Sequence, residues 1–256
     1  MRRSALILRG ASALAAALVA GPTALAQTNS GFEAGLSGWT TLGDVSTLPR
    51  LALLPDGGVS AAVATTASFA DVDDFPLAAG ALNASGSAPL AAGGALETGL
   101  GLAPGALDLD GTAYEGSALS QRLFVSSGDT LSFRWRFASN DGLSGDFAFL
   151  SVGDRVVRLG GVELLPGTPV ADWSRGASAW QDGSYLFTTT GELQIGFGVV
   201  DIGDFTASSA VAIDSLAITP VPGPAAAFVL AAGLALSGAI SRRRRRDRAV
   251  ARPLGG

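Results

Sequence analysis

The side chains in this sequence that could do chemistry are almost all carboxylates. The chain has 256 residues with 22 Asp and Glu, its 17 basic residues are all Arg, and it contains no His and no Cys. Without His or Cys, a Ser-His-Asp triad, a Cys-His pair and the usual zinc sites are excluded. The remaining possibilities need carboxylates alone, namely acid-pair hydrolysis or the binding of a hard cation such as calcium.

Acidic residues dominate the part of the chain between Gln27 and Pro220. This part holds 21 acidic residues against seven Arg, a formal charge of −14, and the other ten Arg lie toward the two ends. Such a surface repels phosphate backbones, so we expect no nucleic-acid binding. Most of the acids lie in Gly-rich turns, where Asp is favoured for backbone reasons. We therefore expect no enzymatic activity, with an acid-pair glycoside hydrolase as a remote alternative.

Short motifs do not indicate an enzyme either. The sequence has no Walker or dinucleotide-binding motif and no G-x-S-x-G elbow, and residues 142–145 (GLSG) have the spacing of a turn. Residues 108–111 (DLDG) are similar to the start of a calcium loop. They lack the distal ligands of such a loop, so a turn is expected there as well.

Aromatic side chains are the candidates for ligand binding, because their rings can stack on the apolar faces of sugars. Trp173, Trp180 and Tyr185 lie in a polar segment and are the residues we expect to contact a polysaccharide. The alternative for these three is a loop that folds over one edge of a sheet. Trp39 and Trp135 are expected in the core, since Trp135 alternates with other large apolar residues.

Alternation of apolar and polar residues indicates β-strands in the body of the chain. Every second residue of 130–138 is a large apolar one, from Leu131 onward, and the same alternation recurs in 193–199. A last strand is predicted over 210–219. Strands with one apolar face are typical of antiparallel sheets that cover a core on one side.

Gly-rich turns join these strands. The Gly-Asp pair at 153–154, flanked by 147–152 and 155–159, is typical of a two-residue hairpin. Residues 51–118 are rich in Ala and Gly and predict short strands and long loops in the same domain. The predicted fold is an all-β antiparallel β-sandwich of the jelly-roll type over 27–220. One short C-terminal apolar helix is expected to follow it.

The first 26 residues have the organisation of a signal peptide. Three Arg within the first nine residues form a positive region, and 11–20 is an apolar-to-small run too short to span a bilayer. Residues 24–26 (ALA) provide the small-x-small pattern that a signal peptidase requires. We predict cleavage after Ala26, so that the mature chain begins at Gln27.

The C-terminus carries a second apolar segment. Pro residues in 221–224 (VPGP) end the preceding strand, because Pro cannot donate to a sheet ladder. A helix over about 224–241 is apolar or small throughout and just long enough to span a membrane. Positive charge keeps the following residues on the cytoplasmic side. The stop-transfer residues are Arg242, Arg243, Arg244, Arg245 and Arg246. We predict a membrane-sorting segment over 221–248 and a cytoplasmic tail over 249–256.

This order of short motif, apolar run and Arg cluster resembles the PEP-CTERM sorting signal of bacterial surface proteins. The motif residues are Val221, Pro222, Gly223, Pro224 and Ala225. They form a Val-Pro-x-Pro-Ala variant, with Gly in place of the usual Glu. Blocks 114–118, 146–149 and 211–215 of the body are similar to blocks of such proteins. The resemblance implies sorting by an exosortase-type enzyme at the inner membrane, and then a place at the cell surface or outside the cell.

The opening of the body, at 29–33 (NSGFE) and 36–39 (LSGW), resembles exported jelly-roll modules that include carbohydrate-binding ones. In those modules the opening meets the last strand at a calcium site. The resemblance therefore implies one structural calcium ion, held by carboxylates and main-chain carbonyls. The implied ligand positions are Glu33, Asp214, Asn29 and Gly31.

The register of Asp214 supports the same prediction. In a regular strand its carboxylate would share an apolar face with Leu216 and Ile218, and no Lys exists in the chain to neutralise it. A lone buried carboxylate is costly unless it is paired or bound to a metal. The alternative is a β-bulge that turns Asp214 toward solvent.

The predicted function is that of an exported, non-enzymatic protein of the cell surface or extracellular matrix, such as a biofilm matrix. The alternative is a carbohydrate-binding module for extracellular polysaccharide. Exposed coplanar aromatic rings across one sheet would favour the sugar-binding alternative. A cleft with two carboxyl groups about 5–10 Å apart would favour hydrolysis.

Overall fold

A computed structural model of the chain describes residues 27–47, 53, 55–56, 58–70, 77–142 and 145–221. The predicted signal peptide, the sorting motif from Pro222 onward, the apolar helix and the Arg cluster lie outside these residues. Among the described residues, no helix has both the length and the apolar character needed to cross a membrane.

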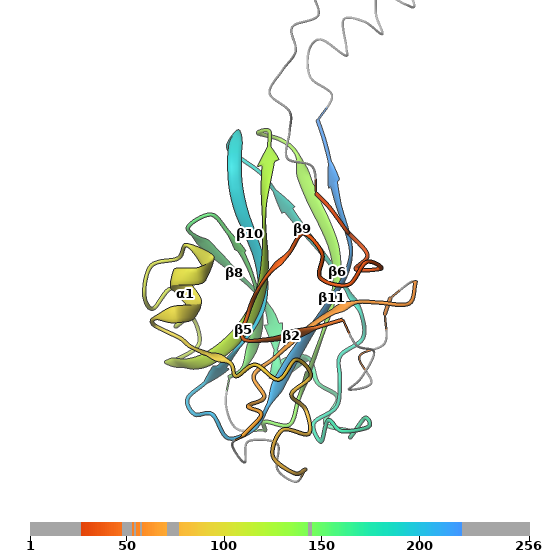
Figure 1. Ribbon diagram of the computed structural model, residues 1–256, viewed down its shortest axis with the longest axis vertical. Coiled ribbons are helices and arrows are strands. Elements are labelled where there is room, and N and C mark those ends of the chain that lie inside the picture. Colours follow the sequence, from red (N-terminus) through yellow and green to blue (C-terminus); the bar gives the residue numbers. More distant parts are fainter. Residues whose placement is uncertain are drawn as a thin grey trace, which may run out of the picture.

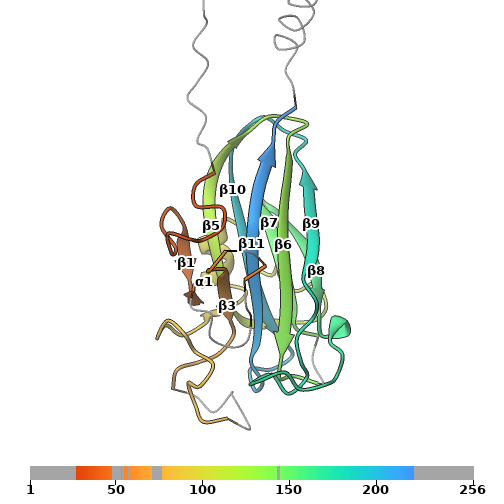
Figure 2. The same ribbon diagram turned by 90° about the vertical axis from the view of Figure 1, so that its right-hand side faces the viewer.

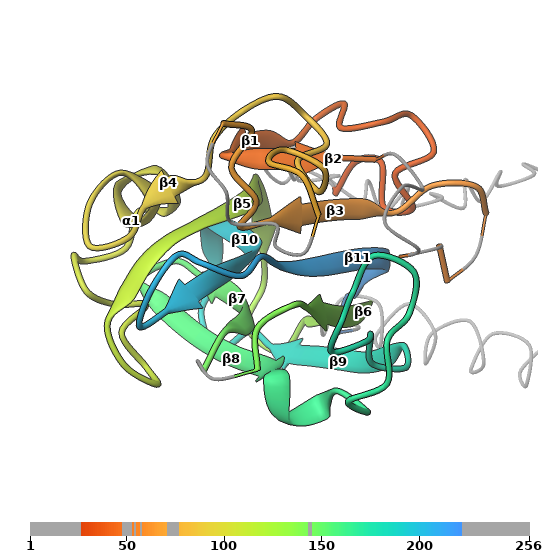
Figure 3. The same ribbon diagram turned by 90° about the horizontal axis from the view of Figure 1, so that it is seen from below.

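The described chain forms two antiparallel sheets that face each other, seen as two layers in Figure 1. The strands of the first sheet, in spatial order, are β1 (Thr40–Leu42), β5 (Ala113–Val125), β10 (Gly191–Ile202), β7 (Phe147–Val152) and β8 (Arg155–Gly161), and β4 (Leu90–Ala91) also pairs with β5. The strands of the second sheet are β2 (Asp44–Ser46), β3 (Ala62–Thr65), β11 (Ser209–Thr219), β6 (Thr130–Ser139) and β9 (Gln181–Leu186). Figure 3 shows the two rows of strands from one end. The prediction of an all-β antiparallel sandwich is confirmed.

Alternating side chains of the two sheets build the central core. In β6 the predicted inward residues are buried, with Leu131 at 0% exposure and Phe133 at 3%. Phe133 packs edge-on against Phe197 of the opposite sheet, with ring centroids 4.8 Å apart. Trp39 and Trp135 belong to the same core, as predicted. Burial of these large side chains on facing sheets is the main contribution to the stability of the sandwich.

The predicted hairpin at Gly153 is also confirmed. Strands β7 and β8 pair through Val152 and Arg155, and Gly153 has a φ of 58°. A positive φ suits the two-residue turns that match the twist of flanking strands.

The Ala- and Gly-rich region contains a feature that alternation did not predict. Helix α1 (Ala95–Leu100) packs on the outer face of the first sheet, to the left in Figure 1. Its buried Leu96 and Leu100 form a cluster with Phe147 and Phe149. The 3-10 turn η2 (Val162–Leu164) follows β8. A helix of six residues shows too little of the 3.6-residue repeat to be recognised from the sequence.

Strand β11 ends at the same end of the sandwich as the first described residues of the chain. Its last residues lie at the upper end in Figure 2, and the Val221 amide donates to Asp129 Oδ1 at 3.0 Å. The strand lies inside its sheet, because it pairs with β3 on one side and β6 on the other. The pairing of β11 with its two neighbouring strands is therefore complete at Thr219.

Candidate functional site

The residues of the predicted calcium site lie together where the opening segment meets β11. The amide of Leu216 donates to the carbonyl of Ser30 at 3.0 Å, which ties the opening to the last strand. A Cβ atom on Gly31 would lie 3.9 Å from Asp214 Oδ1 and 3.9 Å from Glu33 Cγ. The structure therefore places both predicted carboxylate residues next to one glycine.

Asp214 lies on the outer face of its sheet and not on the core face that regular alternation predicts. A β-bulge between Asp214 and Ala217, with Ser215 at a φ of 54°, shifts the register. Asp214 itself is opposite Arg134 of β6, in continuation of the pairing of Ile213 with Trp135, and it is Leu216 and Ile218 that the bulge moves to the other face. Asp214 is still only 2% exposed, because the segment at Asp56 covers it and donates an amide hydrogen bond to Asp214 Oδ2 at 3.0 Å. The alternative of a bulge is thus correct for the backbone, but the carboxylate does not reach solvent.

The polar groups around Gly31 also stabilise turns. Glu33 Oε1 accepts a hydrogen bond from the amide of Val59 at 2.9 Å. The Asn29 side chain donates to the carbonyl of Gly35 at 2.6 Å, which closes the opening turn. The amide group of Asn29 is therefore engaged within its own turn, and a cation beside Asp214 would take carboxylate and main-chain oxygens.

Trp173 does not lie on a binding surface, and its prediction as a ligand residue is wrong. Its exposure is 0%, and it packs in a second apolar cluster with Leu53 and Leu82. The sheet face beneath this cluster carries small side chains, including Ala138 and Ala210. Small residues leave room for a large indole ring, so the polar segment folds back and buries Trp173 over them.

Trp180 and Tyr185 are partly buried and belong to separate environments. Trp180 packs against the cluster of Trp173, with the Arg136 guanidinium 6.0 Å from its ring centroid. Tyr185 packs edge-on against Phe187, with centroids 5.4 Å apart. The described ring pairs are tilted or edge-on and include buried members. The described residues thus offer no coplanar aromatic platform.

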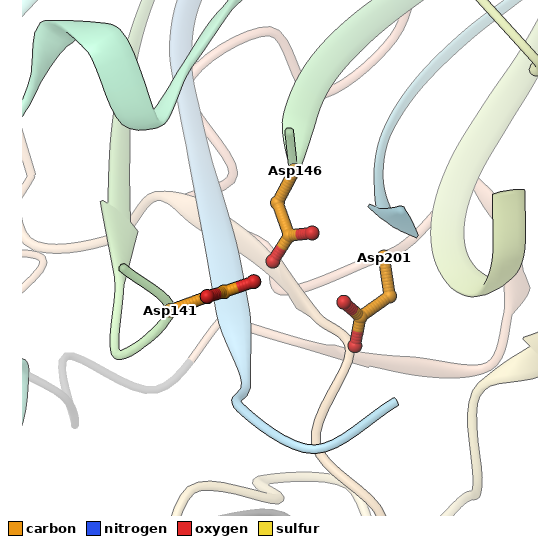
Figure 4. A group of neighbouring side chains, drawn as sticks. All are labelled: Asp141, Asp146 and Asp201. Carbon is orange, nitrogen blue, oxygen red and sulfur yellow. The ribbon is translucent and has the colours of Figure 1, made fainter. Parts of the chain in front are cut away.

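Three buried aspartates converge between the two sheets, at the end of the sandwich away from Val221. Asp141 follows β6, Asp146 directly precedes β7, and Asp201 lies near the end of β10. One carboxylate oxygen of each lies within 4.8 Å of the others, and the residues are 5%, 0% and 1% exposed, respectively. Figure 4 shows the three carboxyl groups pointing toward one another.

The hydrogen bonds of this cluster come from both sheets. Asp146 Oδ1 accepts from the amide of Ile202 at 2.9 Å, and Asp146 Oδ2 accepts from the Ser209 hydroxyl at 2.6 Å. Asp201 Oδ1 is buried and has no hydrogen-bond partner among the described residues. Neither Asp146 nor Asp201 takes part in any of the ion pairs with arginine found among the described residues.

Burial raises the pKa of Asp146 to about 6. Burial also raises the pKa of Asp201, and repulsion from the Asp146 carboxylate raises it further. The physical cause is the same for both residues, because a charged carboxylate loses its hydration in the interior. Both shifts of pKa favour the protonated form of the pair.

Sequence reasoning missed this cluster although a signal was present. Asp201 is in register with Phe197 and Val199, which face the core. The same criterion that singled out Asp214 applies to Asp201, and here no bulge intervenes between it and Val199. Asp141 and Asp146 lie outside regular strands, so alternation carries no information about their direction.

The cluster has the composition of a cation site and lacks the access that an acid-pair hydrolase needs. Its carboxylates are at most 5% exposed, and a polysaccharide chain cannot reach them. Three carboxylates in one place instead match the oxygen ligands that hard cations prefer.

Comparison with known proteins gives no family assignment. No family model matches the sequence, and no curated protein matches it. Among solved structures, the chain is similar to TmCBM61 in complex with beta-1,4-galactotriose, with 16% identity, a TM-score of 0.40 and coverage of 76% of this chain and 97% of the other. A family 16 carbohydrate-binding module has 13% identity, a TM-score of 0.35 and coverage of 75% and 97%.

An adhesin domain has a similar degree of likeness. The K3 cleaved adhesin domain of Lys-gingipain from Porphyromonas gingivalis w83 has 13% identity, a TM-score of 0.39 and coverage of 78% of this chain and all of the other. With every one of these TM-scores below 0.5, the likenesses carry no argument about the ligand or activity of this chain.

Proposed function

We propose that this chain is an exported, non-enzymatic protein of the cell surface or extracellular matrix, whose tail directs sorting at the inner membrane. The observation that carries the proposal is that the last strand of the described body ends before the sorting motif begins. The sandwich completes its central pairing at Thr219, and Val221, the first residue of the sorting motif, is 53% exposed. An exosortase-type enzyme would then recognise a motif that begins just after the last strand of the sandwich ends.

A chain that ends at Val221 should retain the melting temperature of the full chain to within about 2 °C, because all strands of the two described sheets end before the deleted part begins. The same deletion should move the protein from the membrane or surface to the soluble secreted fraction. Melting curves and cell fractionation with immunoblotting measure the two effects. Loss of the folded body on truncation would show instead that the tail is part of the core.

The Arg cluster offers a matched control for sorting. Replacement of Arg242 to Arg246 by Gln should weaken membrane retention, because neutral residues no longer stop translocation. Replacement by Lys keeps the charge and should leave retention unchanged. Equal retention of both variants would contradict the stop-transfer role.

A structural calcium ion beside Gly31 is part of the proposal. Two features support it: Glu33 and Asp214 lie next to this glycine, and the Asp214 carboxylate is 2% exposed. Carboxylate and main-chain oxygens suit calcium, which takes six to eight oxygen ligands at about 2.3–2.6 Å. Asp214→Ala should remove this ion, which a calcium titration followed by calorimetry measures.

A carbohydrate-binding role is the second candidate, and one hollow favours it. Tyr185, Arg155 and Asp154 line a depression of about 240 Å³ beside the β7–β8 hairpin. A ring next to charged and hydroxyl groups is a combination that binds sugars by stacking and hydrogen bonds.

If this role is correct, Tyr185→Ala should weaken binding to a polysaccharide identified on a glycan array by about tenfold, the cost of a lost aromatic contact. Trp180→Ala, which removes a half-buried ring outside this hollow, is the control and should leave the affinity unchanged. A full chain that binds no glycan on the array, or a Tyr185→Ala variant with unchanged affinity, would exclude this hollow as the binding site.

A further inference from the structure

The Asp141, Asp146 and Asp201 cluster, here called the aspartate cluster, contains one buried carboxylate oxygen that the described protein groups do not satisfy. Asp201 is 1% exposed, and its Oδ1 has no donor among the described residues. A buried acceptor without a donor is costly, and a buried carboxylate near two others costs more. Natural proteins resolve such an arrangement with a cation or a shared proton.

The geometry suits a metal ion in the middle of the cluster. Three oxygens whose mutual separations do not exceed 4.8 Å leave a point within about 2.8 Å of each of them, close to the calcium–oxygen distance. The two oxygens of Asp146 each accept one hydrogen bond, and an ionised carboxylate oxygen has a further lone pair for a metal. The cluster can therefore bind an ion without breaking these bonds.

We propose that Asp141, Asp146 and Asp201 bind a calcium ion between the two sheets, at the end of the sandwich opposite Val221. Zinc is disfavoured because it selects His and Cys, and magnesium because it demands an octahedral shell at about 2.0–2.1 Å and retains several waters. The site is separate from the one predicted beside Gly31 and adds to the proposed function.

The ion would join chain segments from both sheets. Asp201 and Asp146 belong to β10 and to the start of β7 in the first sheet, whereas Asp141 follows β6 of the second. The Ser209 hydroxyl, at the start of β11, also bonds to Asp146 Oδ2. Calcium here would therefore couple the closure of this end of the sandwich to the calcium concentration outside the cell.

The test is a titration of calcium chloride into the detergent-purified full chain after treatment with EGTA, followed by calorimetry and melting curves. The wild type should bind calcium and melt at a higher temperature with it. Asp201→Asn should weaken binding at this site by about 100-fold, because it removes one ligand charge. The control Asp154→Asn makes the same change at an exposed hairpin position and should bind like the wild type.

Two further variants distinguish this site from the one beside Gly31. Asp214→Ala should leave the ion of the aspartate cluster in place. The double variant with Asp214→Ala and Asp201→Asn should therefore bind one ion fewer than Asp214→Ala alone. Without calcium, Asp201→Asn should melt no lower than the wild type, since it relieves repulsion. Asp146→Asn provides a second variant of the cluster, and magnesium chloride should not reproduce the effect of calcium.

The proposal is overturned if the wild type gives neither heat nor a shift in melting temperature with calcium. It is also overturned if Asp201→Asn and Asp146→Asn bind calcium like Asp154→Asn. Either result leaves the proposed sorting function unaffected, since fractionation of the truncated chain tests that function independently.

Discussion

Trp173→Ala should lower the free energy of unfolding by about 3–5 kcal/mol, the usual cost of removing a buried aromatic side chain from a packed core. The ring is 0% exposed and packs with Leu53, Val63 and Leu82 on the outer face of the second sheet. This cluster attaches the loops to the sheet, so its loss should also loosen the segment at 170–176. Denaturant unfolding of the full chain and of the variant measures the difference.

Trp180→Ala is the matched control for this prediction. It makes the same substitution in the same segment, but Trp180 is only partly buried against the cluster. The loss of stability should therefore be clearly smaller than for Trp173→Ala. A Trp173→Ala variant that is as stable as the wild type but binds a glycan more weakly would restore Trp173 as a ligand residue.

The contrast between these two residues shows what alternation could predict. A period of two gives the face of a side chain within a strand, and it correctly assigned Phe133 and Trp135 to the core. Trp173 lies in a loop, where direction depends on contacts with distant segments such as the one at Leu53. Long-range packing of this kind leaves no local pattern in the sequence.

The residues of the candidate sites could likewise be predicted where they lie in regular strands and not where they lie in bulges or loops. Asp201 was predictable, because it continues a regular strand whose alternate residues face the core. Asp214 was placed on the wrong face, because the bulge after it changes the register, and a single Ser215 with positive φ has no clear sequence signal. Asp141 and Asp146 became recognisable only when the two sheets brought the ends of three segments together.

A different aspartate, Asp44, should show the largest effect among the carboxylates outside the aspartate cluster. It lies in β2 at 0% exposure, opposite Thr65 of β3, whose hydroxyl donates to its Oδ2. The Ala84 amide donates to the same carboxylate at 3.1 Å and the Ser85 amide at 2.7 Å. One side chain thus joins an edge strand, its neighbour and a loop that is 40 residues away in the sequence.

Asp44→Ala should lower the free energy of unfolding by about 3–5 kcal/mol, because it leaves several donors without their charged acceptor. Thr65→Val removes one of the hydrogen bonds to Asp44, together with the one that the Ala67 amide donates to the Thr65 hydroxyl, and should cost about 2 kcal/mol. Asp154→Ala, at an exposed turn, should change stability by no more than about 0.5 kcal/mol. Denaturant unfolding of the wild type and the three variants measures these losses of stability.

Hydrogen exchange gives a local measure of the same role. In Asp44→Ala the amides of Ala84 and Ser85 should exchange faster than in the wild type, whereas Asp154→Ala should leave them protected. If Asp44→Ala proved as stable as Asp154→Ala, with unchanged exchange at these two amides, the carboxylate would not be what holds the loop on the sheet. The attachment would then rest on the apolar contacts of Leu82, which is 0% exposed beside the same loop.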